Sequence, residues 1–277
     1  MTALQSILKV IIRANATPDA MAWLDEERPL NTAFAITPRK TGKAVITVTD
    51  EQAHQLTSIA PGFTVDGWAI DRLVRVYLLL KADKGDKEAY FRAIENLFLA
   101  AEMGELVALY SALPVLPYPE MWMKRCSEGI RSNIGDVLAA IMYSNPYPSK
   151  YLDQNAWNQL VLKAFFTDKE IGKIIGIDTR ANKELAYILS DYAHERWAAK
   201  REVNLSLWRL VGSFIDDKLF ADIKRLFDDG KLVDRQAGAL AISASNYQPA
   251  KELLNKYPEL VTALENKNLS WDTLTGK

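Results

Sequence analysis

Apolar positions recur with helical spacing along most of the chain. Near the N-terminus, five of them share one face of a helix predicted over residues 3–14: Leu4, Ile7, Leu8, Ile11 and Ile12. From about residue 64 onward the helical period continues almost without interruption. Met103 to Leu113 forms one further predicted helix, which Pro114 and Pro117 end because proline disfavours helix in the residue before it. The pattern therefore predicts an all-α fold.

The C-terminal half reads as a series of helices with short connections. Their predicted ranges are 153–166, 180–201, 204–215, 216–229, 231–245, 249–256 and 258–267. Short connections favour antiparallel neighbours, so we expect a multi-helix array of antiparallel helical pairs. HEAT-like stacking is one arrangement of such pairs, although no strict repeat of 30–45 residues demonstrates it.

Residues 17–50 differ from the rest of the chain. Phe34–Ile36 and Ala44–Val48 flank the polar stretch Thr37–Lys43, which contains Pro38 and Gly42. Two apolar arms around such a stretch are typical of a small β-hairpin, or of a loop with extended arms. This is the one place where the sequence predicts β-structure.

Length and composition fit a globular protein. The 277 residues, of which 49% are hydrophobic and 25% charged, are enough for a sizeable core. We predict one helical domain over residues 1–277. It would consist of an N-terminal helix and hairpin-like segment (1–63), a helical core (64–245) and C-terminal helices (246–277).

Charge and cysteine content bear on whether the protein binds nucleic acid and on where in the cell it is located. The formal charge is −1, with 34 basic and 35 acidic residues interleaved, so no basic stripe predicts nucleic-acid binding. The single cysteine, Cys126, allows no intramolecular disulfide and fits a cytoplasmic location. Lys9 and Arg13 interrupt the apolar N-terminus, which predicts an amphipathic helix and not a signal peptide. The apolar run Val76–Leu80 is too short to span a membrane.

Recognisable catalytic patterns are missing from the sequence. His54 and His194 lie 140 positions apart, so they lack metal-ligand spacing, and we predict no metal site and no cofactor. There is no glycine-rich phosphate loop and no Gly-x-Ser-x-Gly elbow. Cys126 is interpreted as a core residue, because a lone helical cysteine usually packs in the interior. No residue is therefore assigned as catalytic.

Acidic residues in the second half have both structural and functional interpretations. Asp178 precedes a long helix and could cap it. Asp191 and His194 are i,i+3 neighbours and could form a surface pair. The functional alternative is an unrecognised enzyme in which Asp191, His194 and Glu195 act as acid and base, since histidine titrates near neutral pH.

Several segments in a fixed order carry a resemblance. They are Leu109–Glu120, Glu128–Asn133, Asn145–Pro148, Trp157–Phe166, Gly176–Asn182, Tyr192–Arg201 and Leu207–Gly212. Together they resemble the central region of the EboA-like family, over residues 109–215. The resemblance weakens over the first 60 and the last 30 residues. Two positions depart from it, because the family often carries an acid where Ala139 stands and glycine where Lys200 stands.

The resemblance implies a role in metabolite traffic. The family is associated with bacterial gene clusters whose other products would be the partners: a TatD-like hydrolase relative, a UbiA-like membrane prenyltransferase and a sugar-isomerase-like barrel. Such clusters are linked to moving a secondary metabolite or its precursor toward the cell envelope. No catalytic residue set can be carried over from the family to this chain.

The resembling segments are rich in polar and aromatic side chains on otherwise apolar helices. The candidate ligand-binding residues are Arg131, Asn133, Trp157, Asn158, Lys163, Asp178, Arg180, Asn182, His194, Glu195, Arg196, Trp197 and Arg209, with Asn145 and Trp208 beside them. Buried polar groups must be paired, so the cluster is either a structural network or the lining of a pocket. A pocket would favour a carrier of a small metabolite, and a fully paired network with an exposed apolar patch would favour a pure protein scaffold.

Overall fold

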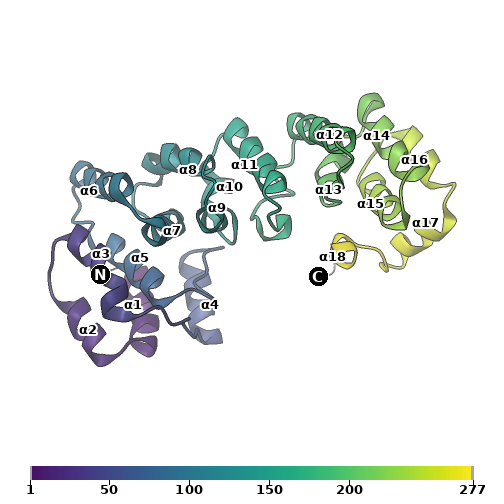
Figure 1. Ribbon diagram of the computed structural model, residues 1–277. Coiled ribbons are helices and arrows are strands. Elements are labelled where there is room, and N and C mark those ends of the chain that lie inside the picture. The colour runs from purple at the N-terminus through teal and green to yellow at the C-terminus, as the bar shows by residue number, and fades with distance from the viewer. Residues whose placement is uncertain (1, 276–277) are drawn as a thin grey trace. The chain divides into compact units, whose positions relative to one another are not determined.

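The computed structural model describes residues 2–275, and these residues form an all-helical protein (Figure 1). They contain eighteen α-helices and three short 3-10 helices, with two isolated β-bridges and no sheet. The predicted all-α fold is therefore confirmed, whereas antiparallel pairing and HEAT-like stacking stay predictions. No helix among these residues combines the length and the apolar character needed to cross a bilayer.

The described residues group into two compact units. Unit 1 contains residues up to Leu160 together with Gly172–Ile175, and unit 2 contains Val161–Ile171 and the residues from Gly176 onward. The prediction of one domain over residues 1–277 is not tested by this grouping and stays a prediction.

Unit 1 is built around one central helix, α5 (Ile70–Lys81), which is buried from Ile70 to Leu80 except for the half-buried Arg72. It packs against α1 (Ala3–Asn15), α3 (Leu30–Thr41) and α7 (Met103–Ala112). The other helices of the unit are α2 (Pro18–Asp25), α4 (Asp50–Ile59), α6 (Lys87–Ala100), η1 (Pro119–Trp122), α8 (Met123–Gly129), α9 (Gly135–Met142) and α10 (Pro146–Tyr151). Cys126 in α8 is fully buried and burial raises the pKa of its thiol to about 12, so its assignment to the core is confirmed.

Helix α11 (Gln154–Phe166) contributes to both units, and the remaining helices belong to unit 2 apart from part of η2 (Ile171–Lys173). In unit 2, α15 (Leu232–Ser243) packs against several of its neighbours. These neighbours are α13 (Leu207–Val211), η3 (Gly212–Phe214), α14 (Asp217–Asp228), α16 (Gln248–Leu254), α17 (Pro258–Glu265) and α18 (Trp271–Thr275). Helix α12 (Lys183–Ala198) packs against α13 and α14. The predicted C-terminal helices are thus confirmed, with ends displaced by a few residues.

The predicted β-hairpin is wrong, because its first arm is helical. Phe34 and Ile36 lie within α3, where Phe34 is buried against the core. The second arm is extended, but it pairs elsewhere: the Ile46 amide donates to the Trp68 carbonyl at 2.9 Å, and the Ile70 amide donates to the Ala44 carbonyl at 2.9 Å. The partner of this arm is therefore the segment before α5, which lies far away in the sequence.

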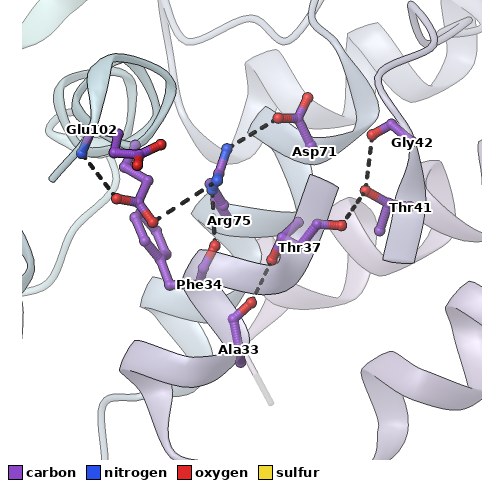
Figure 2. Close-up of polar contacts among 9 residues, drawn as sticks. Ala33, Phe34, Thr37, Thr41, Gly42, Asp71, Arg75 and Glu102 are labelled. Atoms are coloured by element: carbon purple, nitrogen blue, oxygen red, sulfur yellow. Dashed lines mark hydrogen bonds and ion pairs between the residues drawn. The ribbon is translucent and has the colours of Figure 1, made fainter. Parts of the chain in front are cut away.

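A proline inside α3 explains why the sequence pattern pointed away from a helix. Pro38 has no amide hydrogen, so it leaves the Phe34 carbonyl, four residues earlier, without its helical partner. Arg75 of α5 replaces that partner, because its Nε donates to the Phe34 carbonyl at 3.0 Å (Figure 2). Figure 2 also shows Arg75 bonded to Asp71, at 3.0 Å. The hydrogen bond from Arg75 thus compensates for the one that Pro38 cannot make, and the segment remains helical.

Candidate functional site

The predicted site residues of unit 1 occupy two environments. Arg131 and Asn133 are exposed in the connection between α8 and α9. Trp157 and Asn158 are buried on α11, and Asn145 is buried before α10. The structure therefore separates the two exposed residues from the interior ones, which are held within the packing of the unit.

Asn145 joins three helices through its buried side chain. Its amide nitrogen donates to the carbonyls of Tyr110 on α7, at 3.1 Å, and of Ala140 on α9, at 2.9 Å. Its amide oxygen accepts from the backbone nitrogen of Tyr147 at 3.0 Å and so caps α10. Both donor hydrogens and the acceptor are used inside the protein, which is the behaviour of a structural residue.

Asp178 and Arg209 meet in unit 2 as a bidentate ion pair. The Nε and Nη2 atoms of Arg209 donate to the two carboxylate oxygens of Asp178, each at 2.6 Å. The interpretation of Asp178 as a helix cap is wrong, because Asn182 caps α12 by accepting from the Leu185 amide at 2.9 Å. Asp178 is exposed and Arg209 half-buried, so the pair lies at the surface of the unit.

His194 and Trp197 belong to a second group on α12. His194 Nε2 lies 2.5 Å from Asp222 on α14, and the Ser190 hydroxyl donates to the other oxygen of the same carboxylate at 2.6 Å. The suggested pair of His194 with Asp191 is wrong, since Asp191 lies 3.7 Å from Lys218 instead. Trp197 stacks on buried Trp208 at 5.7 Å, and Arg225 lies over the Trp197 ring at 4.3 Å.

The remaining predicted residues of unit 2 are spread over its surface. Lys163, Arg180, Asn182 and Arg196 are half-buried and Glu195 is exposed. Arg196 donates to the Glu202 carbonyl at 2.9 Å. The side chains that converge in this unit thus do so as internal pairs, and their role as ligand-binding residues stays a prediction.

A cavity lies in unit 1 where the two proline-rich breaks between helices, residues 113–119 and 145–148, come together. We call it the proline-lined cavity; its volume is about 690 Å³. Its walls come from the start of α1, from the segment after α4, from the end of α5, and from both breaks. The lining residues are Thr2, Ala3, Leu4, Gln5, Ile59, Ala60, Pro61, Phe63, Leu80, Asp83, Pro114, Val115, Pro117, Pro146, Tyr147, Lys150 and Tyr151.

Hydrogen bonds between distant segments hold the walls of this cavity. Gln5 donates through Nε2 to the Leu80 carbonyl at 2.8 Å, which fixes α1 to the end of α5. The buried Tyr147 donates its hydroxyl to the Pro119 carbonyl at 2.5 Å, which joins the two breaks. Burial raises the pKa of the Tyr147 hydroxyl above its ordinary value. Proline rings also restrict the backbone, and the cavity is therefore preformed.

The chemistry of the proline-lined cavity is mainly apolar. Proline, leucine, valine and aromatic side chains supply most of the wall, while Asp83 and Lys150 place one negative and one positive charge on it. Lys150 is exposed and lies 5.3 Å from the centre of the Tyr151 ring. Cavities of several hundred Å³ with apolar walls and a few polar groups are typical of small-molecule sites.

Sequence reasoning missed this cavity although it recognised both breaks. In the sequence, Pro114 and Pro117 end a predicted helix and Asn145–Pro148 is one of the resembling segments, but nothing indicates that the two segments meet. Their meeting depends on the packing of α7, α9 and α10, and no local pattern reports it. The signal that could have found it is the occurrence of both breaks within the resembling segments.

Comparison with known proteins places the chain in a family. The family model described as metabolite traffic protein EboA matches residues 4–212, which include nearly all of unit 1 and the first part of unit 2. No curated protein and no solved structure matches the chain. The matched range covers well over half of the 277 residues, and the chain therefore belongs to the EboA family of metabolite traffic proteins.

Proposed function

We propose that this protein is a non-catalytic carrier that holds a largely apolar small metabolite in the proline-lined cavity. The observation that carries the proposal is the meeting of Pro114, Pro117 and Pro146 on one apolar cavity of about 690 Å³. The matched range includes every wall of that cavity except Thr2 and Ala3, and the family description concerns metabolite traffic. Burial of apolar ligand surface would supply the binding free energy, at about 25 cal/mol per Å².

The carrier would act in the cytoplasm and pass its cargo to partner proteins. The partners expected from the resemblance are the TatD-like, UbiA-like and sugar-isomerase-like products of the same gene clusters, in the transfer of a secondary metabolite toward the cell envelope. A rigid, preformed cavity suits this role because little conformational entropy is lost on loading.

The test is native mass spectrometry of the chain, purified gently from cells that contain the whole gene cluster. Val115→Trp fills the cavity with an indole, and Val10→Trp makes the same substitution at an exposed position of α1 outside it. Wild type and Val10→Trp should both show the additional mass of a bound small molecule, and Val115→Trp should not. If wild type never carries a small molecule, or if Val115→Trp retains it equally, the proposal fails.

A pure protein scaffold is the second candidate. It is favoured by the internal pairing of Asp178 with Arg209 and of His194 with Asp222, and by exposed apolar side chains such as Leu232. Normal assembly of the partners in cells that lack this chain would contradict it. The enzyme alternative has less support, because the contacts of His194 lead to Asp222 and not to Asp191 or Glu195.

A further inference from the structure

Arg72 has a half-buried guanidinium group whose hydrogen-bonding capacity is largely unused. Its Nε donates to the Ser111 hydroxyl at 2.8 Å, and its guanidinium carbon lies 3.8 Å from the centre of the Trp68 ring. The two Nη groups make no hydrogen bond and no ion pair with any residue in the range 2–275. A guanidinium carries five N–H donors, so four of them are available to an outside acceptor.

The neighbouring carboxylate of Asp71 does not form an ion pair with Arg72. Asp71 is its neighbour in the sequence, and consecutive helical residues do not face each other. Asp71 instead accepts from Arg75, one helical turn further along, at 3.0 Å. Burial lowers the pKa of Arg72 to about 10, which still leaves the group positively charged at neutral pH. A desolvated cation without a carboxylate partner is energetically unfavourable, unless a ligand supplies one.

Arg72 faces a second cavity of unit 1, with a volume of about 520 Å³. Exposed Lys43 and Lys173 add two positive charges to its wall. Ala139 and Gly104 also line it, and their small side chains leave space in the cavity. Three carboxylates also line it. Asp71 is compensated by Arg75, and Asp66 and Asp136 are exposed to solvent.

The charges on this wall favour one class of anion. Lys43, Arg72 and Lys173 oppose Asp66, Asp71 and Asp136, so the cavity as a whole has little excess positive charge. The exposed carboxylates repel a dianion more strongly than a monoanion, and a monoanion can be held by the planar fork of Arg72 alone. Arginine matches the geometry of a carboxylate by donating two parallel hydrogen bonds.

We propose that the Arg72 cavity is a binding site for a small monocarboxylate, whose two oxygens accept hydrogen bonds from the Nη groups of Arg72. The site is separate from the proline-lined cavity, and it does not depend on the carrier function. It would give the protein a second ligand, or a means by which a carboxylate metabolite regulates it.

The test is isothermal titration calorimetry of the full chain at pH 7.5 with benzoate as the probe. Benzamide is its neutral counterpart of similar shape. Benzoate should bind saturably and benzamide at least about tenfold more weakly, because hydrogen bonds to charged groups are the stronger ones. Equal binding of both compounds, or no saturable binding of benzoate, would overturn the proposal.

Two variants locate the site on Arg72. Arg72→Met should weaken benzoate binding by about 10- to 100-fold. It removes a cation without a carboxylate partner, so it should leave the fold intact. Ala139→Glu keeps Arg72 but adds a competing carboxylate to the wall, on the half-buried face of α9, and should weaken binding similarly.

A matched control removes one positive charge elsewhere in unit 1. Arg92 is exposed on α6 and does not line the cavity, so Arg92→Met should bind benzoate as wild type does. Unchanged affinity in both Arg72→Met and Ala139→Glu would overturn the assignment. Phenyl phosphate, mostly a dianion at this pH, should bind more weakly than benzoate, and tighter binding of it would contradict a monocarboxylate site.

Discussion

Arg75 and Arg72 lie one turn apart on α5, but they differ in their partners: the guanidinium of Arg75 is paired with a carboxylate, and that of Arg72 is not, within residues 2–275. Arg75 is only 4% exposed, yet it has the Phe34 carbonyl and the Asp71 carboxylate as hydrogen-bond partners, with Glu105 4.0 Å away. Burial lowers its pKa, and the neighbouring carboxylates act in the opposite direction. Arg75 is therefore a structural residue, while Arg72 keeps donors available.

Replacing Arg75 tests its structural role. Arg75→Met leaves Asp71 without its main partner and the Phe34 carbonyl without a donor, both in the interior. We expect the free energy of unfolding to fall by about 3–5 kcal/mol, as for other broken buried ion pairs. Urea denaturation measures this, with Arg92→Met as a control that should change stability by less than about 0.5 kcal/mol. A loss below about 1 kcal/mol for Arg75→Met would contradict the role.

Helix ends are set by local chemistry in many of these elements. Thr2 and Thr49 form capping boxes with Gln5 and Gln52, and Asn182 caps α12. Asp216 caps α14 by accepting from the Leu219 amide at 3.2 Å, and it also accepts from the Tyr187 hydroxyl and from Lys183. These bonds, the one from Tyr187 first, lower the pKa of Asp216 to about 2.

The cap at Asp216 predicts a pH dependence. Because its pKa in the folded protein lies below the ordinary value of 3.8, the ionised carboxylate stabilises the fold above pH 4. That contribution is lost as the pH falls toward 2. Asp216→Ala should lower the free energy of unfolding by about 1 kcal/mol at pH 7, and the difference from wild type should shrink between pH 4 and about 2.

Urea denaturation of wild type and Asp216→Ala at pH 7, 4 and about 2.5 measures this dependence. Asp229→Ala is the control, because Asp229 is 75% exposed and its ion pair with Arg225 spans 3.8 Å. It should change stability by less than about 0.5 kcal/mol at every pH. A difference for Asp216→Ala that does not vary with pH would show that the carboxylate charge is unimportant.

Two helices of unit 2 approach closely at Gly212. A Cβ atom there would lie 2.6 Å from the Ala241 carbonyl oxygen and 3.0 Å from its Cα, so any larger residue must push η3 away from α15. We expect Gly212→Ala to lower the free energy of unfolding by about 1–3 kcal/mol. Gly104→Ala in α7 is the matched control, since its Cβ would meet only the Arg75 side chain at 3.7 Å. Equal stability of the two variants would rule out the steric conflict.

The grouping of the described residues into two units gives a prediction for the whole molecule that is an alternative to the single domain expected from the sequence. The described residues form two compact units, and cooperative unfolding often follows such units. We expect calorimetry to show two transitions. Arg75→Met should lower the midpoint of one and Gly212→Ala that of the other. A single transition that both variants shift equally would instead support one domain over residues 1–277.

Several features of this protein could be predicted from its sequence. The predicted helices over 153–166 and 258–267 agree closely with α11 and α17, because periodic apolar faces, caps and prolines act within a few residues. Membership of the EboA family could also be predicted from the sequence, since it rests on the order of the resembling segments along the chain.

The persistence of α3, the proline-lined cavity and the Nη groups of Arg72 that stay unpaired within the described residues were decided by tertiary packing, because each depends on groups that are distant in the sequence. Helix α3 exists although Pro38 interrupts it, since Arg75 satisfies the carbonyl that the proline leaves free. The proline-lined cavity forms where two breaks meet, and the availability of Arg72 follows from Asp71 pairing with Arg75 instead. Such outcomes depend on which partner each polar group finds in three dimensions, and spacing along the chain does not specify that partner.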